Sequence, residues 1–450
     1  MAEETERRGR VEEGGTRAPQ RRPLAWRDPA FHDEEALLAE MARVFEVCHG
    51  CRRCFSLCNA FPTLFDAIDA GESGEPEDLP REVYWQVAEH CYLCDLCFQT
   101  KCPYVPPHPF DIDFPHLMLR AKAVRLRQGR VRLRDRILTA TDAVGRLAGI
   151  PVVVEAVNRA NRSPLARALM ERVLGVHRDA ALPPYRARPL RRRLAADAED
   201  AEARPAGRTR GRVVLFATCY GNRNEPEIGE DLAAVFRHNG IPVTLTRRER
   251  CCGMPRMELG DLEEVVRLAE INLPQLLPLV EAGWDVVAPV PSCVLLFRRE
   301  LPLLLPGDER VARVAQAFFD PFEYLWLRHR EGLLRTDFRN PLGRIAYHVP
   351  CHLRVQNIGL KTRDVLALVP GTEIEVIERC SGHDGTYAVK REYHETSMRI
   401  GRPVFERVRR ARAEHYASDC PMAGRQIGSG LGDGSSPVHP MTLLRRAYGI

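Results

Sequence analysis

The sequence predicts a multidomain α+β protein, in which a helical, cysteine-bearing module is followed by two repeated α/β halves. Two observations predict this division. The N-terminal third carries two clustered runs of cysteines within helical patterns. After about residue 212, short apolar strands alternate with amphipathic helices, and this alternation occurs twice. Since 450 residues are enough for two or three domains, we expect the helical region and the α/β region to fold as separate units.

The two cysteine runs share one spacing. They are Cys48, Cys51, Cys54, Cys58 and Cys91, Cys94, Cys97, Cys102. Three cysteines at every third residue aim their thiolates inward from one tight loop, so a fourth ligand must come from elsewhere. Two-cluster bacterial ferredoxins use such runs for [4Fe–4S] cubanes, and the fourth cysteine of each run ligates the other cluster. This rule predicts one cluster on Cys48, Cys51, Cys54 and Cys102, and a second cluster on Cys91, Cys94, Cys97 and Cys58.

The alternatives to two cubanes are zinc and disulfides. The second run has four residues rather than three before Cys102, but this departure removes no ligand. Structural zinc sites usually take two cysteine pairs separated by a longer loop, so the spacing favours iron–sulfur clusters. Thiolates that are kept for metal imply a reducing compartment, and we therefore expect a cytoplasmic protein. No apolar stretch approaches the roughly 20 residues that span a bilayer.

The composition and charge of the chain limit the kinds of partner that it is expected to bind. The formal charge of +5 with 28% charged residues describes a mixed-charge surface rather than a polycation. Arginines are concentrated in the helical pattern from Lys122 to Arg136. The simplest interpretation is a solvated helix face, and the alternative is a patch for an acidic partner or for anionic lipid. No aromatic residues are interleaved for base stacking, so nucleic acid is not an expected partner.

The predicted domain boundaries lie where the composition or the hydrophobic pattern of the sequence changes. Residues 1–30 are Arg/Glu/Gly/Pro-rich and are expected to be disordered. Residues 31–185 form the helical cysteine module with a helical extension; its first helix is capped by Asp33 and runs to about Val47. Residues 186–211 are a charged linker. The two α/β halves are residues 212–335 and 340–450.

The two halves form an internal repeat. In each half, three predicted strands end at cysteines, so that Cys219 corresponds to Cys351, Cys251 to Cys380 and Cys293 to Cys420. The offsets of 132, 129 and 127 residues are nearly constant. Because the carboxyl ends of parallel strands meet in one crevice, where open α/β sheets usually hold ligands, the cysteines of each half are expected to converge.

The repeat, with Cys251-Cys252-Gly253 in its first half, resembles the cysteine-rich CCG domain of the heterodisulfide reductase and anaerobic glycerol-3-phosphate dehydrogenase iron–sulfur subunit family. That family joins an α-helical ferredoxin module to one or two CCG domains. Tyr347-His348-Val349-Pro350-Cys351-His352 and Asp419-Cys420-Pro421-Met422-Ala423 look especially like the glycerol-3-phosphate type. The resemblance covers about residues 35 to 450.

The resemblance implies a ligand set in each half. The family pattern of five cysteines holds a non-cubane cluster in some members and zinc in others. Val290 replaces one of these cysteines in the first half, and Ser381 and Ala417 replace two in the second. The remaining ligands are Cys219, Cys251, Cys252 and Cys293 in the first half, and Cys351, Cys380 and Cys420 in the second. The first set can complete an iron–sulfur cluster or a zinc site. The second needs a fourth ligand, for which His352 and His383 are the nearest candidates.

The function that these patterns favour is electron transfer. The chain is expected to pass electrons between a flavoprotein dehydrogenase subunit and an acceptor, because it carries no flavin or nicotinamide fingerprint of its own. By resemblance the acceptor is a membrane quinone, reached from the cytoplasmic face, or a soluble redox protein. The alternative is a thiol–disulfide reductase that uses the CCG crevice, and a third interpretation is a zinc-bound binding module. Residues 428–434 are expected to form a flexible glycine-rich loop.

Overall fold

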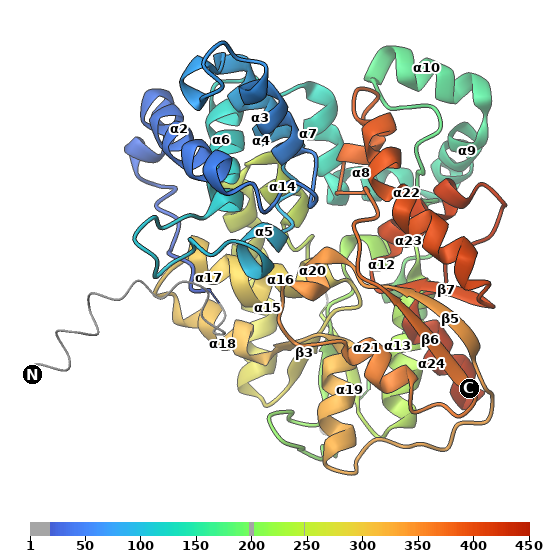
Figure 1. Cartoon of the computed structure of the whole chain (residues 1–450). Helices are drawn as coiled ribbons and strands as arrows, with labels where there is room; N and C mark the ends of the chain where they lie inside the picture. Colours follow the sequence, from blue (N-terminus) through green and yellow to red (C-terminus); the bar gives the residue numbers. More distant parts are fainter. Residues whose placement is uncertain (1–18, 198–201, 247) are drawn as a thin grey trace, which may run out of the picture. The chain divides into compact units, whose positions relative to one another are not determined.

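The computed structural model describes residues 19–197, 202–246 and 248–450, and these divide into two units (Figure 1). One unit holds the described residues up to Arg130 together with Glu258–Gly260, and the other holds the rest from Val131 to Ile450. The helices after Arg130, which the sequence analysis joined to the cysteine module, therefore fall in the second unit.

The first unit consists of helices. They are α2 (Glu34–Cys51), α3 (Ala60–Asp69), α4 (Arg81–His90), α5 (Leu96–Thr100) and α6 (Phe114–Arg127), with the 3-10 turns η1 (Pro29–His32) and η2 (Pro76–Asp78). As predicted, the Asp33 side chain caps α2 by accepting the Ala36 N–H at 2.7 Å. The apolar stripe of α2, including Met41 and Phe45, is buried. The helix continues past Val47 to Cys51 and carries the first two cysteines on its last turn.

The prediction of disorder is wrong for residues 19–30, whereas residues 1–18 lie outside the described residues. Arg21 lies against the second cysteine loop, where its guanidinium binds Asp95 at 2.6 Å and stacks over the Phe98 ring at 4.6 Å. Trp26 is buried as well. A low content of apolar residues could not indicate this order, because a buried ion pair and a single tryptophan fix the segment.

The second unit begins with a helical segment. It comprises α7 (Leu133–Thr139), α8 (Thr141–Ala148), α9 (Pro151–Arg162) and α10 (Pro164–Leu174). Within the predicted linker, the short helix α11 (Leu190–Arg193) buries Leu190 completely. A Cβ on Gly229 would lie 2.2 Å from the Leu190 side chain, so this part of the linker packs closely on the first α/β half.

The first half contains a four-stranded parallel sheet. Its strands are β1 (Val213–Leu215), β2 (Val243–Leu245), β3 (Asp285–Val287) and β4 (Phe318–Phe319), in the order β2-β1-β3-β4. The helices are α12 (Cys219–Arg223), α13 (Pro226–His238), α14 (Met254–Leu259), α15 (Leu262–Glu281), α16 (Pro291–Leu295), α17 (Leu301–Leu304), α18 (Glu309–Ala317) and α19 (Pro321–Arg330), with a π-helical turn over Leu296–Glu300.

The second half repeats this topology. Strands β5 (Gly343–His348), β6 (Thr372–Ile377) and β7 (His415–Ser418) are parallel in the order β6-β5-β7, which matches β2-β1-β3. The helices are α20 (Cys351–Arg354), α21 (Lys361–Leu366), α22 (His394–Ala411), α23 (Pro421–Leu431) and α24 (Pro440–Tyr448), and Tyr387–Val389 forms the 3-10 turn η4. The predicted internal repeat is confirmed at the level of sheet order.

The glycine-rich segment after Cys420 differs from the prediction. Residues up to Leu431 are helical and belong to α23, so the expected flexible loop is wrong for residues 428–431. These glycines serve close packing. A Cβ on Gly430 would lie 2.2 Å from the Phe405 ring, and a Cβ on Gly428 would lie 2.8 Å from the Tyr416 hydroxyl. Gly432 then ends the helix in the left-handed conformation.

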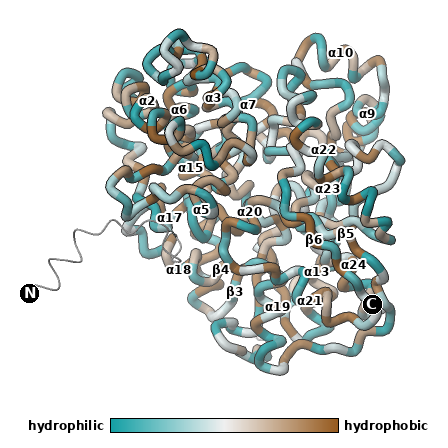
Figure 2. The backbone as a smooth tube through the Cα atoms, in the orientation of Figure 1, coloured by the Kyte–Doolittle hydropathy of each residue, from teal (hydrophilic) through white to brown (hydrophobic). Residues whose placement is uncertain are grey.

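The two halves share one hydrophobic core. Buried residues of β1 and of β5, such as Leu215 and Tyr347, belong to the same cluster, and α13 packs on α24. Hydrophobic residues mark the strands of this region in Figure 2. The shared core fixes the six cysteine-bearing strand ends of the second unit relative to one another.

Candidate metal centres

The first predicted cluster set lines one hollow in the first unit. Cys48, Cys51, Cys54 and Cys102 all contribute to its wall, and its volume is about 320 Å³ including the open mouth. Apolar side chains such as Phe61 and Ile112 form much of the remaining wall. The structure thus brings the fourth ligand of this set from the second cysteine run, 48 to 54 residues after the other three along the chain.

The pKa shifts of these cysteines are consistent with the same grouping. Burial raises the pKa of Cys54 to about 12, and the charges of Cys102 and Cys51 add to the effect. Burial and the same neighbours raise the pKa of Cys48. Burial also raises the pKa of Cys102. Thiols that resist ionising side by side fit a multinuclear iron site, because the iron ions would supply the positive charge that four thiolates require.

The second predicted set is also brought together. Burial raises the pKa of Cys58 to about 12, with Cys91 as the next cause. Burial and the neighbouring thiols of Cys94, Cys91, Cys54 and Cys58 raise the pKa of Cys97. Cys58 thus lies near the second run, as the crossed arrangement requires, and Cys54 of the first run lies near Cys97 as well.

Two cations lie close to the first set. The charges of Lys101 and Arg53 lower the pKa of Cys54 and so oppose the larger effect of burial. Arg52 lies in the same run, but its guanidinium is held by Asp69 at 2.5 Å. Arg53 and Lys101 are therefore the cations that act on Cys54.

In the second unit, the four cysteines of the first α/β half form a row of thiols. Cys219 begins α12, Cys251 and Cys252 follow β2, and Cys293 lies in α16. The Sγ atoms of Cys219 and Cys251 are 3.7 Å apart. Cys252 interacts with both Cys251 and Cys293, which closes the row. Hydrogen bonds from Cys219 and Cys252 outweigh burial and lower the pKa of Cys251.

The sequence analysis missed a residue that contacts this row. Asp142 in α8 accepts the backbone N–H of Cys251 at 2.7 Å, although the two residues are 109 positions apart. A pocket of about 560 Å³, including its open mouth, lies beside Cys251 between α8 and α15. Its charged lining comprises Arg146, Arg250, Arg256, Arg267, Asp142 and Glu264. No local pattern marks Asp142 as a neighbour of a cysteine, so no sequence signal could have found it.

The second α/β half keeps its three cysteines at the strand ends. Cys351 begins α20, Cys380 follows β6, and Cys420 precedes α23. Burial raises the pKa of Cys420 to about 12, and the Cys351 charge contributes. Cys380 accepts the Gly382 N–H at 3.3 Å. Ala417, which stands in place of a family cysteine, is buried in β7.

The two histidines expected as candidates for a fourth ligand differ in their surroundings. His352 Nδ1 lies 2.8 Å from the Ser292 hydroxyl of the first half, so this nitrogen already has a partner. His383 Nε2 is buried and has no hydrogen-bond partner among the residues that the structure describes. Burial lowers the pKa of His383 to about 4, which keeps its imidazole neutral, as a metal ligand must be.

All fifteen cysteines are free thiols in this structure. Over residues 19–197, 202–246 and 248–450, no three His, Cys, Asp or Glu side chains converge as the ligands of a single metal ion would. Over the same ranges, no helix is both long enough and apolar enough to cross a bilayer.

Comparison with known proteins accounts for the repeat. The profile of the cysteine-rich domain family CCG matches residues 213–298 and again residues 345–427. One subunit of the anaerobic glycerol-3-phosphate dehydrogenase of Escherichia coli K12 is 29% identical over 347 residues, which cover 75% of this chain and 83% of that protein. The glycolate oxidase iron–sulfur subunit of the same organism is 25% identical over 371 residues, covering 79% and 83%.

A third relative matches a shorter stretch. It is one subunit of the CoM/CoB fumarate reductase of Methanothermobacter marburgensis, and it is 27% identical over 249 residues, which cover 53% of this chain and 46% of that protein. The two segments that match the CCG profile contain every second-unit cysteine discussed above. The chain thus carries two cysteine-rich domains of the CCG family and is homologous to a subunit of anaerobic glycerol-3-phosphate dehydrogenase and to the glycolate oxidase iron–sulfur subunit.

Proposed function

We propose that this chain is the iron–sulfur electron-transfer subunit of an oxidoreductase, with two [4Fe–4S] clusters in its helical unit. The observation that carries the proposal is the crossed grouping, in which Cys102 shares a hollow with Cys48, Cys51 and Cys54. Such crossing is the ligand rule of two-cluster ferredoxins. The clusters, when bound, supply one-electron redox chemistry. The chain supplies the thiolates, the surrounding burial, and the charges of Arg53 and Lys101.

The electron donor in this proposal is a flavoprotein dehydrogenase subunit. Two of the relatives are named as subunits of a glycerol-3-phosphate dehydrogenase and of a glycolate oxidase. Residues 428–434 contain several glycines but lie partly in α23, so they do not form a dinucleotide-binding turn between a strand and a helix. The free thiols support a cytoplasmic location.

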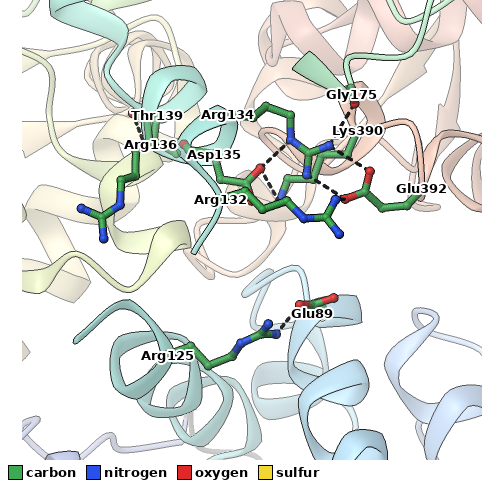
Figure 3. Close-up of polar contacts among 10 residues, drawn as sticks. All are labelled: Glu89, Arg125, Arg132, Arg134, Asp135, Arg136, Thr139, Gly175, Lys390 and Glu392. Carbon is green, nitrogen blue, oxygen red and sulfur yellow. Dashed lines mark hydrogen bonds and ion pairs between the residues drawn. The ribbon is translucent and has the colours of Figure 1, made fainter. Parts of the chain in front are cut away.

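The electron acceptor is either a membrane quinone or a soluble redox protein. The arginine-rich segment from Lys122 to Arg136 gives the first choice little support, because three of its guanidinium groups have acidic partners within the chain (Figure 3). Arg132 and Arg134 both bind Glu392 at 2.7 Å, and Arg125 binds Glu89. These pairs reduce the positive charge that the segment could offer to anionic lipid.

The ligand assignment can be tested by paired substitutions. Protein purified anaerobically should contain about eight iron and eight sulfide per chain for two cubanes. We expect Cys54→Ser and Cys102→Ser to lose the same EPR signal of the dithionite-reduced protein, and Cys97→Ser and Cys58→Ser to lose the other. If Cys102→Ser removed the signal that Cys97→Ser removes, the crossed grouping would be wrong. A folded protein without iron would overturn the electron-transfer proposal.

The first CCG half supports a further metal centre on Cys219, Cys251, Cys252 and Cys293, as an iron–sulfur cluster or as zinc. About twelve iron per chain would assign a third cluster, whereas about eight iron with one zinc would assign zinc. For the second half, we propose His383 as the ligand that joins Cys351, Cys380 and Cys420, because its Nε2 is buried and unpartnered among the described residues. If the metal content were unchanged in His383→Ala, this ligand would be wrong.

The second candidate function is thiol–disulfide reduction in the first CCG half. The pocket beside Cys251, with its four arginines, favours it because a small anionic disulfide could approach the thiol row from that side. Reduction of a disulfide by two electrons and two protons yields two thiols, and the helical unit would deliver the electrons. Turnover of oxidised glutathione by the dithionite-reduced protein, lost in Cys251→Ser, would support this function. If the protein did not turn over oxidised glutathione, this second function would be wrong and electron transfer would be the only function proposed.

A further inference from the structure

Arg21 binds the segment of residues 91–97, which carries three of the four proposed ligands of the second cluster. Its Nη2 and Nη1 atoms donate to the two carboxylate oxygens of Asp95 at 2.6 and 2.8 Å. Asp95 stands between Cys94 and Cys97 in the sequence. The side chains of Arg21 and Asp95 are buried, with 8% and 6% of their surface exposed. Because two-pronged, charge-assisted pairs fix geometry as well as adding energy, this contact holds the cysteine segment in place.

The guanidinium of Arg21 is also held on two other sides. Its Nε lies 3.0 Å from a carboxylate oxygen of Asp113, which caps α6 by accepting the His116 N–H at 3.2 Å. Its central carbon lies 4.6 Å from the centre of the buried Phe98 ring in α5. A planar guanidinium can fork onto carboxylates and stack on a ring at the same time, whereas a lysine ammonium cannot. Arg21 therefore ties the cysteine segment to α6.

The backbone of the cysteine segment needs such support. Leu93 has a φ of +50° and Asp95 a φ of +61°, in the left-handed region that side-chain-bearing residues rarely adopt. Conformations of this kind persist only where the surrounding structure holds them. A second contact comes from α6, where Lys122 Nζ donates to the Cys91 carbonyl oxygen at 2.7 Å. The segment is thus fastened at Cys91 and at Asp95, on either side of the residue with the least favourable backbone.

The charge of Asp95 gives Arg21 a second effect. Without Arg21, a buried carboxylate would stand beside thiolates that already carry negative charge. A buried charge that loses its partner is costly, so the segment would open or shift. Net charge close to an iron–sulfur cluster also sets its reduction potential. An unpaired Asp95 carboxylate would therefore make the second cluster harder to reduce.

We infer that Arg21 is a positioning residue of the second cluster, although it precedes the first cysteine of the module by 27 residues. The inference rests on the proposed two-cluster function and adds part of the segment of residues 19–30 to the cluster site. Arg22 offers a matched control. It makes an ion pair of similar length, with its Nε 3.0 Å from an Asp111 oxygen, but its side chain is 74% exposed.

The test compares the full-length holoprotein with Arg21→Ala and Arg22→Ala after anaerobic purification. The two reduced EPR signals are followed during incubation with a ferrous chelator, and the midpoint potential of each is measured. We expect Arg21→Ala to lose the signal that Cys97→Ser lacks about 10- to 100-fold faster than wild type does, the usual effect of an outer-shell partner on metal affinity. The potential of that signal should fall. The other signal should keep its wild-type rate and potential, and Arg22→Ala should match wild type in both.

Two more variants separate positioning from a loss of folding. Arg21→Lys keeps the charge but not the fork, so the potential should stay near wild type while the signal is lost faster. Arg21→Ala/Asp95→Asn removes both charges, and asparagine tolerates the left-handed backbone, so the potential should return toward wild type.

Three results would overturn the inference: equal loss of both signals from Arg21→Ala, the same effect from Arg22→Ala, or an Arg21→Ala protein with unchanged rate and potential. Wild-type protein with fewer than two clusters would overturn the two-cluster proposal and this inference with it. An unchanged Arg21→Ala beside a two-cluster wild type would overturn this inference alone.

Discussion

At the scale of single residues, the chain uses burial to set the charge of its polar groups. The cysteines of the helical unit are examples: burial is the first cause that raises the pKa of Cys54 and Cys58 to about 12. Their thiols are therefore protonated at neutral pH unless a metal competes for the sulfur. Loading of the clusters should release protons, since the thiolate is the form that binds metal.

Asp285 shows the same effect away from the cysteines. It lies at the start of β3, where it accepts the Arg210 N–H at 2.6 Å and the Tyr324 hydroxyl at 3.1 Å. Burial nevertheless raises its pKa from 3.8 to about 6. The folded state thus holds the proton more tightly than the unfolded state does. The stability that Asp285 contributes is full below pH 3.8 and is lost as the pH rises through about 6.

We therefore predict that Asp285→Asn makes the stability of the second unit less dependent on pH. Between about pH 5 and about pH 8, wild type should lose stability that the variant keeps, because only wild type loses the protonated carboxyl. Urea midpoints and hydrogen exchange at the two pH values measure this difference. Asp433→Asn is the control: the pKa of Asp433 is lowered by Ser435, so it stays ionised over this range and its variant should parallel wild type. A difference between Asp285→Asn and wild type that did not change with pH would contradict the prediction.

At the scale of elements, the backbone of the loop that carries Cys380 packs closely against α22. A Cβ on Gly401 in α22 would lie 2.4 Å from the Ser381 carbonyl oxygen, and a Cβ on Gly382 would lie 2.0 Å from the Ser397 carbonyl oxygen. Gly382 also has a φ of +79°, which favours glycine. Two glycines on facing segments thus allow the backbone approach that positions Cys380.

Gly401→Ala should separate this loop from α22. We expect it to lower the free energy of unfolding of the second unit by about 1–3 kcal/mol, the usual cost of overpacking. Gly50→Ala in α2 of the first unit is the control for helix propensity alone, since Gly50 is also helical and a Cβ there would meet nothing within 4 Å. That variant should be neutral or slightly more stable, because alanine favours a helix over glycine. Equal effects of both substitutions in chemical denaturation would show that close packing is not the cause.

At the scale of the whole molecule, the two CCG halves are built as one unit. Asp231 in α13 of the first half accepts the Thr442 hydroxyl at 2.5 Å and the Arg445 guanidinium at 2.8 Å, both from α24 of the second half. Arg425 of the second half likewise binds Glu225 and Tyr220 of the first. Polar contacts therefore bridge the two halves beside their shared hydrophobic core.

We predict that Asp231→Ala destabilises both halves together, by about 1–3 kcal/mol for the lost charged hydrogen bonds. Hydrogen exchange should then become faster in β1 and in β5 by the same factor, because both strands belong to one core. Arg193→Ala in α11 is a control on the same unit, as its side-chain contacts join the linker to Glu227 and Glu230 of the first half and involve no described residue of the second. Faster exchange confined to α24 would mean that the halves unfold independently.

The sequence by itself determined the features that depend on local spacing. The cysteine runs, the capped helix after Asp33, the repeated alternation of strands and helices and the resemblance to CCG domains all follow from short-range patterns, and the structure or the comparisons agree with the fold class and the family. The helix that ends at Leu431 was missed, since glycines in a row indicate a loop unless their packing partners are known.

Only the tertiary structure decided which distant groups meet. It brought Asp142 to Cys251, Arg21 to Asp95, and Arg132 and Arg134 to Glu392. It also showed that α10 turns Leu165 outward and Arg167 inward, whereas the sequence pattern is equally consistent with the opposite orientation. The physical reason is the same in each case: a periodic pattern defines the two faces of an element, but the partners that offset the cost of burial decide which face is covered.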